Sequence, residues 1–245
     1  MIYEIYHETN FDYAGLVTFS HNIARLKPKN CSTQRLLEYS LSIEPNPYET
    51  NEFIDYFENT NNFMLIREAH KNLKVIATSK VERLEYEIKK ESYLLNTIKL
   101  TVKDLRDRLS TYHPEDVLAK YFLFETESIP MPSSEIKEYI LKSFTEDRNI
   151  IEAANEFMAR IFNDFKFVSG FSDITTPIEV IFKEKKGVCQ DFAQFAISAL
   201  RSIGIPARYV SGYIQTLPPE GKEKLFGADA SHAWFSIYIP DFGWV

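Results

Sequence analysis

Alternating apolar and polar positions predict β-strands in the first part of the chain. Two runs show this period of two, and their alternate members are Leu37, Tyr39, Leu41 and Ile43 in the first and Leu73, Val75, Ala77, Ser79 and Val81 in the second. Such a period is typical of strands with one buried and one solvated face. Turn-forming segments at 45–47 and 59–62 separate the runs. We therefore expect residues 1–95 to form a β-rich domain, an antiparallel β-sandwich.

From about Thr101 the period becomes helical. The strongest helix pattern has Thr145 as its expected cap, and its apolar positions are Ile150, Ile151, Ala154, Phe157, Met158, Ile161, Phe162 and Phe165. The preceding stretch shows no clear period, and we interpret residues 96–133 as a connector packed on the second domain. Residues 96–245 as a whole are expected to form a mixed α and β domain, which makes the fold class α+β.

Two further helices are expected near the centre of this second domain. The sequence Thr176-Pro177-Ile178-Glu179 is typical of a capping box, and the helix that it opens should end near Lys185–Gly187, where the glycine can turn left-handed. The next helix starts at Cys189 and ends at Gly204 and Pro206. Its buried side is predicted to comprise Phe192, Ala193, Ala196, Ile197, Leu200 and Ile203.

Two strands follow this helix, at 207–214 and 231–239, with a polar loop from Gln215 to Asp229 between them. In the second strand, alternation divides the side chains between two faces: His232, Trp234, Ser236 and Tyr238 on one, and Ala233, Phe235, Ile237 and Ile239 on the other. A histidine on a strand that follows a cysteine-led helix suggests a nucleophile and its base.

The composition and charge of the chain argue against two classes of function, nucleic-acid binding and membrane insertion. The 245 residues carry 28 basic and 35 acidic side chains, a net charge of -7, so no basic footprint for nucleic acid is expected. No apolar run is long enough to cross a membrane, and no signal peptide is recognisable at the N-terminus, so we expect neither membrane insertion nor export from the cytoplasm. The two cysteines, Cys31 and Cys189, are expected to be free thiols in that compartment.

Cys189 carries the candidate chemistry. A cysteine in the first turn of a helix meets unpaired N–H groups and the positive end of the helix dipole, and both favour the nucleophilic thiolate. The same N–H groups can hold an oxyanion. Small buried cysteines at helix starts are also common, so placement alone leaves a packing role open. Cys31 lies in a polar loop with no such surroundings and is expected to be an ordinary thiol.

The sequences GVCQDFAQFAISALRSIGIPARYVSGYI and DASHAWFSIYIPDFGWV resemble the core of the transglutaminase-like superfamily, in its bacterial branch with a β-rich N-terminal domain. The resemblance covers roughly residues 165–245, and the N-terminal strands with Ser20-His21-Asn22 resemble the N-terminal domain of that branch. It implies a papain-like α+β core and a Cys-His-Asp triad, with Cys189 as nucleophile and His232 as imidazole. The family commonly has histidine where this chain has Gln194.

The third triad member is the main departure. In the family an Asp-Pro sequence follows the Gly-Trp strand, whereas this chain ends at Trp244-Val245, so we expect the natural chain to continue and the carboxylate to lie beyond Val245. Asp241 does not substitute, because nine positions of extended chain would place it more than about 20 Å from His232. A hairpin at 240–243 would instead bring a position about five residues past Val245 opposite His232.

The remaining candidates are supporting residues. Gln190 and Asp191 follow the cysteine as possible oxyanion or supporting groups, and Asp191 also suits the helix dipole in a purely structural role. Tyr213 and Trp234 are candidates to line the acyl-donor groove, although strand aromatics are more often core. The histidines at positions 7, 21, 70 and 113 show no ligand spacing, so we expect no metal and no cofactor.

Two functions are compatible with these residues. The first is thiol-dependent acyl transfer on carboxamides of a protein or peptide substrate, either to an amine, as in a transglutaminase, or to water, as in a peptidase or amidase. The second is a non-catalytic module that binds a protein or peptide and carries an incomplete triad. The sequence does not define the acyl acceptor, the pathway or the oligomeric state.

Overall fold

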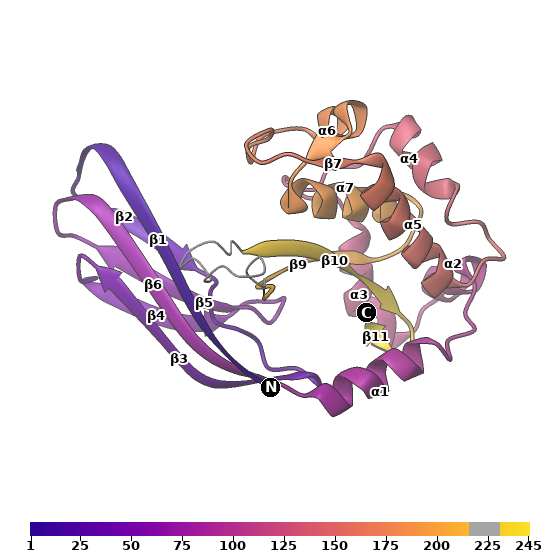
Figure 1. Cartoon of the computed structure of the whole chain (residues 1–245), viewed down its shortest axis with the longest axis horizontal. Coiled ribbons are helices and arrows are strands. Elements are labelled where there is room, and N and C mark those ends of the chain that lie inside the picture. The colour runs from indigo at the N-terminus through magenta and orange to yellow at the C-terminus, as the bar shows by residue number, and fades with distance from the viewer. Residues whose placement is uncertain (216–230) are drawn as a thin grey trace, which may run out of the picture. The chain divides into compact units, whose positions relative to one another are not determined.

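A computed structural model of the chain describes residues 1–215 and 231–245, which form two compact units, Met1–Leu94 and Leu95–Val245 (Figure 1). The fold is mixed α and β with antiparallel sheets, as the sequence predicts. The polar loop expected after Gln215 lies outside the described residues. None of the described helices is long and apolar enough to span a bilayer.

The first unit is a sandwich of two three-stranded antiparallel sheets. One sheet has the order β1-β6-β3 and the other β2-β5-β4. The strands are β1 (Ile2–Val17), β2 (Ser20–Ala24), β3 (Gln34–Glu44), β4 (Glu49–Ile54), β5 (Thr60–Ile66) and β6 (His70–Arg83). Met64 and Ile66 of β5 pack with Leu73 and Val75 of β6, so the sheets share a small core.

The alternation in β6 is confirmed, whereas that in β3 is wrong at one position. Leu73, Val75, Ala77, Ser79 and Val81 are all buried. In β3, Tyr39, Leu41 and Ile43 point inward as predicted, but Leu37 is 41% exposed. The register against β6 shifts between Leu36 and Glu38, which makes Leu37 the extra residue of a β-bulge and gives its inward place to Leu36.

The second unit is built around one central helix, α7. Its helices and short 3-10 turns are α2 (Val102–Ser110), η1 (Pro114–Asp116), α3 (Val117–Lys120), η2 (Tyr121–Leu123), α4 (Ser134–Leu141), α5 (Ile150–Asp164), α6 (Ile178–Glu184) and α7 (Cys189–Ser202), and α1 (Glu85–Leu95) leads into it. Its strands are β7 (Lys166–Phe167), β8 (Lys186–Gly187), β9 (Ala207–Gly212), β10 (His232–Ile239) and β11 (Gly243–Trp244). β11, β10 and β9 form one antiparallel sheet, while β7 and β8 pair in parallel.

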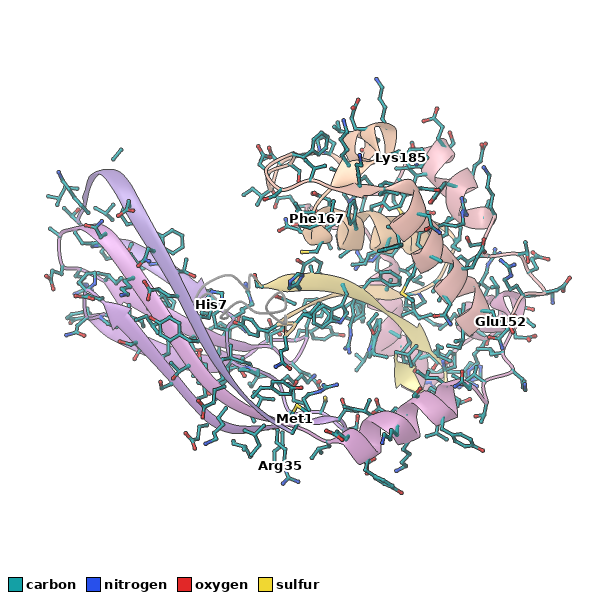
Figure 2. The ribbon with its side chains drawn as sticks, viewed as in Figure 1. Met1, His7, Arg35, Glu152, Phe167 and Lys185 are labelled. Atoms are coloured by element: carbon teal, nitrogen blue, oxygen red, sulfur yellow. The ribbon has the colours of Figure 1, made fainter. Side chains whose placement is uncertain are left out.

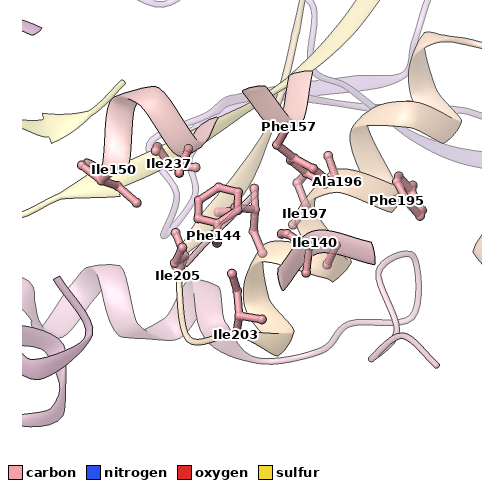
Figure 3. Close-up of a cluster of buried hydrophobic side chains, with 14 of the residues drawn as sticks. Ile140, Phe144, Ile150, Phe157, Phe195, Ala196, Ile197, Ile203, Ile205 and Ile237 are labelled. Carbon is pink, nitrogen blue, oxygen red and sulfur yellow. The ribbon is translucent and has the colours of Figure 1, made fainter. Parts of the chain in front are cut away.

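Helix α7 is buried on nearly every side. It packs on β9 and β10 and also contacts α4, α6 and η2 (Figure 1). Ala193 and every residue from Phe195 to Arg201 are buried, a wider surface than the single side that the periodicity predicts. Figure 3 shows the centre of this core, where Phe195, Ala196 and Ile197 of α7 lie among apolar side chains of the neighbouring elements. A helix buried on nearly every side is the expected centre of such a fold, and its buried polar side chains, Ser198 and Arg201, donate hydrogen bonds to backbone carbonyls.

Helix α5 begins and packs differently from the prediction. Its cap is Asn149, whose side chain accepts hydrogen bonds from the N–H groups of Ile151 and Glu152, and not Thr145. The buried face comprises Ile150, Ala153, Phe157 and Ile161, while Met158 and Phe162 are 48% and 84% exposed. These two residues are each one position past a buried residue, so they are turned about 100° from the core stripe.

The capping box expected at Thr176 is also wrong. Helix α6 starts at Ile178, and its cap residue, Pro177, has no capping side chain. The Thr176 hydroxyl is bound to Asp173 instead, where it accepts a hydrogen bond from the backbone N–H at 3.0 Å. A threonine whose oxygen serves a preceding turn is not available to a following helix.

The left-handed residue that ends α6 is Lys185, with φ 53°, and not Gly187. Lys185 is half-buried, and its ammonium lies 3.6 Å from the ring centre of Phe182 and 4.3 Å from that of Phe165. Burial lowers the pKa of this lysine. The aromatic contacts hold Lys185 in the left-handed backbone conformation that the sequence analysis expects at Gly187. In Figure 2, Lys185 is labelled beside α6.

The end of α7 follows the prediction. Gly204 is left-handed, with φ 81°, and its N–H donates to the Arg201 carbonyl while the Ile205 N–H donates to the Leu200 carbonyl. This pair of bonds is a Schellman motif, which satisfies carbonyls that a helix end leaves open. The chain is thereby turned directly into β9.

The stretch interpreted as a connector is largely helical. Val102, Leu105 and Leu109 of α2, together with Ala119 of α3, are buried in the core of the second unit. Thr101 caps α2, and its hydroxyl and the Asp104 carboxylate bond to each other's backbone N–H groups. Val102, Leu105 and Leu109 have the spacing of one helix face, so local periodicity does indicate α2, whereas the turns from Pro114 to Leu123 are too short to show a period and are stabilised by tertiary packing.

Candidate active site

Cys189 is the first residue of α7, as predicted. Its cap residue, Val188, has no side-chain acceptor for the helix N-terminus. The first three helical N–H groups, those of Cys189, Gln190 and Asp191, have no acceptor within the helix by the geometry of an α-helix. The thiol is free and half-buried. A thiol and a group of open N–H donors therefore lie together at the start of a 14-residue helix.

Asp191 closes the turn that precedes the cysteine. Its side chain is buried, and its Oδ2 accepts a hydrogen bond from the Val188 N–H at 2.7 Å. The Ser172 hydroxyl donates a second hydrogen bond to the same oxygen. The first contact fixes the local backbone and the second ties it to the loop after β7, so in this structure the Asp191 side chain serves the helix start.

His232 is the first residue of β10, and it lies directly opposite Gly212 of β9. The sheet that carries it is the surface on which α7 packs. Tyr209 of β9 pairs with Phe235 of β10, and strand alternation places both on the face opposite to that of His232. Burial raises the pKa of Tyr209, and negative charge at Cys189 and Asp191 raises it further. Cys189 and His232 are thus carried by two elements that pack together, α7 and β10.

The thiol and the imidazole are not hydrogen-bonded to each other. Within residues 1–215 and 231–245, neither side chain forms a hydrogen bond or an ion pair, and His232 has no carboxylate partner. Catalytic hydrogen bonds are often long in the absence of substrate and tighten only when it binds. The described residues thus bring the two elements together without completing a triad.

Trp234 and Tyr213 both lie close to His232 in the sheet. The Trp234 indole lies across β9 against Gly212, and its exposed fraction of 40% leaves a large apolar surface open. Tyr213 follows β9 directly, and burial raises the pKa of its phenol. Gln190, the second residue of α7, is half-exposed. Gln194, where relatives of the expected family commonly have histidine, is also half-exposed.

The hairpin after β10 has the register expected from the sequence. Ile237 and Val245 exchange two backbone hydrogen bonds of 2.9 Å, and Tyr238 pairs with Trp244. His232 is five residues before Ile237, so a strand continuing in this register would face His232 five residues past Val245. Asp241 lies in the turn at the other end of β10, where it forms an ion pair with Arg108 at 3.5 Å.

One group of side chains has the composition of a metal site: His113, Glu115 and Asp116 have ligand atoms within 4.8 Å of one another. Both carboxylates already bind a cation. Arg108 donates to Asp116 at 2.8 Å and to Glu115 at 2.7 Å, and Tyr238 donates to the other Asp116 oxygen. An arginine so close disfavours a divalent ion, so this cluster does not fit a metal centre.

Cys31 is exposed in the first unit, beside Thr33.

Two residues near the candidate nucleophile are absent from the sequence analysis. Ser172 lies in the loop after β7 and reaches Asp191 over a separation of 19 positions. Tyr209 lies in β9, and negative charge at Cys189 and Asp191 contributes to its raised pKa. It shares a face of β9 with buried Ala207 but is itself 39% exposed, so strand alternation does not single it out. No local pattern marks Ser172, since its partner is distant in the chain.

Comparisons with known proteins cover both units. Residues 3–82 match the bacterial transglutaminase-like N-terminal region, and residues 137–245 match the transglutaminase-like superfamily. An uncharacterized protein of Mycobacterium tuberculosis is 31% identical over 238 residues, which are 97% of this chain and 74% of that protein. A protein-glutamine gamma-glutamyltransferase of Pseudomonas aeruginosa is 35% identical over 68 residues, 27% of this chain and 10% of that enzyme.

A solved structure shares the complete fold. The crystal structure of a candidate cysteine protease from Cytophaga hutchinsonii matches with a TM-score of 0.70 at 19% identity, over 100% of this chain and 77% of that one. Together with the sequence matches over both units, this likeness confirms the expected fold. The chain belongs to the transglutaminase-like superfamily, with the bacterial transglutaminase-like N-terminal region preceding the core.

Proposed function

We propose that this protein performs thiol-dependent acyl transfer on carboxamide groups of a protein or peptide substrate. The observation that carries the proposal is the position of Cys189 at an uncapped helix start, on a helix that packs against the sheet opened by His232. A thiol placed in this way has N–H donors beside it for the negative charge that develops on a substrate carbonyl.

The reaction would run in two steps, acylation of the thiol and then transfer of the acyl group to the acceptor. His232 takes the proton from the Cys189 thiol, and the sulfur attacks the carbonyl carbon to form a tetrahedral oxyanion facing the N–H groups of α7. The carbon–nitrogen bond breaks, the amine leaves with the proton that His232 returns, and a thioester remains. An amine or a water molecule then attacks the thioester, loses a proton to His232 and releases the thiol.

The identity of the acceptor divides the proposal into a transglutaminase and a hydrolase. The name of the Pseudomonas aeruginosa relative supports the first, and the likeness to a candidate cysteine protease of Cytophaga hutchinsonii supports the second. Both activities use the same thioester, so the arrangement at Cys189 serves either.

Thioester trapping with a glutamine-containing dipeptide tests the proposal. The intact protein should gain the mass of the acyl group at Cys189, and the Cys189→Ala variant should gain none. Cys31→Ala is the matched control, because that thiol is exposed and lies in the other unit. Addition of a primary amine or of water alone to the trapped thioester shows which acceptor resolves it. Labelling that is absent from Cys189 overturns the proposal.

The alternative is a non-catalytic module that binds a protein or peptide. The observation in its favour is that neither the thiol nor the imidazole has a hydrogen-bond partner among the described side chains. Peptide binding that survives in Cys189→Ala, together with no thioester in the parent protein, would favour this reading. Loss of turnover with binding retained would favour the enzyme.

A further inference from the structure

The backbone just before Cys189 is held by one half of a capping box. A typical cap residue accepts hydrogen bonds from the first helical N–H groups through its own side chain, whereas Val188 has no such acceptor. The side-chain bond at this turn runs in the reverse sense, from the Val188 N–H to the Asp191 carboxylate at 2.7 Å. The turn is therefore fixed while the first N–H groups of α7 stay open.

Gly187 provides the space for this carboxylate. A Cβ atom at Gly187 would lie 2.8 Å from Oδ2 of Asp191 and 2.9 Å from its Cβ, closer than real side chains approach. The glycine is buried, and its φ is not in the left-handed region. Close approach rather than backbone conformation is thus the reason for glycine at this position.

Ser172 connects the same oxygen to a second segment. Its hydroxyl donates to Oδ2 of Asp191, and the loop that carries it follows β7. The loop is already tied to the turn, because the Val168 N–H donates to the Gly187 carbonyl at 2.9 Å. One buried carboxylate oxygen therefore joins the loop after β7, the turn before Cys189 and the first turn of α7.

We infer that Asp191 is a positioning residue for the nucleophile: with Ser172 it fixes the turn so that the Cys189 sulfur and the open N–H groups of α7 face one reacting carbonyl. The inference rests on the proposed function and assigns a separate role to each group in it. Cys189 supplies the sulfur, the backbone supplies the oxyanion donors, and the Ser172–Asp191–Val188 contacts set the angle between them. Such an angle matters for a tetrahedral oxyanion and much less for a displacement at a saturated carbon.

Two reactions of the same thiol separate these requirements. Alkylation by iodoacetamide forms a carbon–sulfur bond with loss of iodide and needs no oxyanion donor. Acylation by p-nitrophenyl acetate forms a thioester through a tetrahedral oxyanion and releases p-nitrophenolate, so it does need those donors. Both rates are measured on the full chain in a Cys31→Ser background, with Ser172→Ala, Ser172→Thr and Asp191→Ala as the variants.

The inference predicts that Ser172→Ala lowers acylation at least about tenfold while alkylation changes by less than about threefold. Ser172→Thr keeps the hydroxyl and should restore acylation. Asp191→Ala should show a larger loss of the same kind, and if that variant does not fold, Ser172→Ala decides alone, because its half-exposed side chain leaves the core intact. Acylation and alkylation that stay unchanged, or that fall in parallel, overturn the inference.

The proposed function fails in a different way. If the proposed function is wrong, the two single-cysteine proteins react alike: Cys189 in the Cys31→Ser protein is acylated no faster than Cys31 in the Cys189→Ser protein. This comparison is made before any change at Ser172 or Asp191. A fast parent reaction that Ser172→Ala leaves untouched removes only the positioning role.

Discussion

The Trp234 indole lies against Gly212, the residue that faces His232 across β9 and β10. A Cβ atom at Gly212 would lie 2.7 Å from Cη2 of the indole, so an alanine there must displace the ring. The displaced atom is the far end of a side chain that is 40% exposed, and the ring can swing outward without disturbing the core. Gly212 thereby sets where an apolar surface stands beside the candidate imidazole.

We predict that Gly212→Ala lowers kcat/KM for a glutamine-containing dipeptide about tenfold, because it moves the Trp234 indole, which we propose lines the acyl-donor groove. Thermal unfolding should change little. Gly15→Ala is the control, since a Cβ atom there meets nothing within 4 Å. Equal kinetics for the two variants would show that the indole does not contact the substrate.

Replacement of His232 tests the base. His232→Ala should lower the rate of thiol acylation by about a hundredfold or more, the usual contribution of a general base. His113→Ala, which removes a half-exposed imidazole from the same unit, should leave the rate unchanged. An acylation rate in His232→Ala that matches the parent rate would exclude the imidazole from the mechanism.

Two phenylalanines on α5 differ in burial and should differ in their contribution to stability. Phe157 is fully buried among Tyr139, Phe144 and Phe195, and Phe157→Ala should lower the free energy of unfolding by about 3–5 kcal/mol. Phe162 is 84% exposed, and Phe162→Ala should change it by less than about 0.5 kcal/mol. Urea denaturation measures both. A large loss for Phe162→Ala would mean that its side chain is covered in solution.

Alkaline pH should weaken the second unit through Tyr238. Burial raises the pKa of Tyr238 to about 12, and its hydrogen bond to Asp116 contributes to the shift. The unfolded chain loses this proton first, near the ordinary pKa of 10, so the stabilisation is complete below pH 10 and is lost as the pH rises toward 12. Tyr238→Phe should be less stable than the parent below pH 10 and should show a smaller decline between pH 10 and 12 in urea titrations. A parallel decline in both proteins would assign the effect to other groups.

Much of the fold could be predicted because its strands and long helices repeat their apolar residues at regular spacing. Leu73 to Val81 and the start of α7 at Cys189 follow directly from that spacing. The errors occur where a tertiary contact overrides a local preference. Leu37 is displaced by a bulge, and Lys185 adopts a left-handed backbone because three aromatic rings lie around its ammonium.

The candidate site could be predicted from the sequence only in part, for a similar reason. Cys189 is recognisable because a cysteine falls in the first turn of a predicted helix, and His232 because it lies on a strand after this helix, in a sequence that resembles the transglutaminase-like core. Ser172 is not, since its role depends on a hydrogen bond to a residue in another element. The short turns between residues 114 and 123 escape notice because each is too short to show a helical period and depends on packing, such as that of Ala119 into the core.

The burial of α7 on nearly every side has a consequence for heat inactivation. Amide hydrogens in an element so enclosed exchange with solvent only when the whole unit opens, so those from Phe195 to Leu200 should be the slowest of the described residues. Because Asp191 in the first turn of that helix is also buried and is hydrogen-bonded to Val188 and Ser172, we expect the surroundings of Cys189 to persist for as long as the unit remains folded. Loss of thiol reactivity on heating should therefore coincide with global unfolding, without an earlier step in which the site alone is lost.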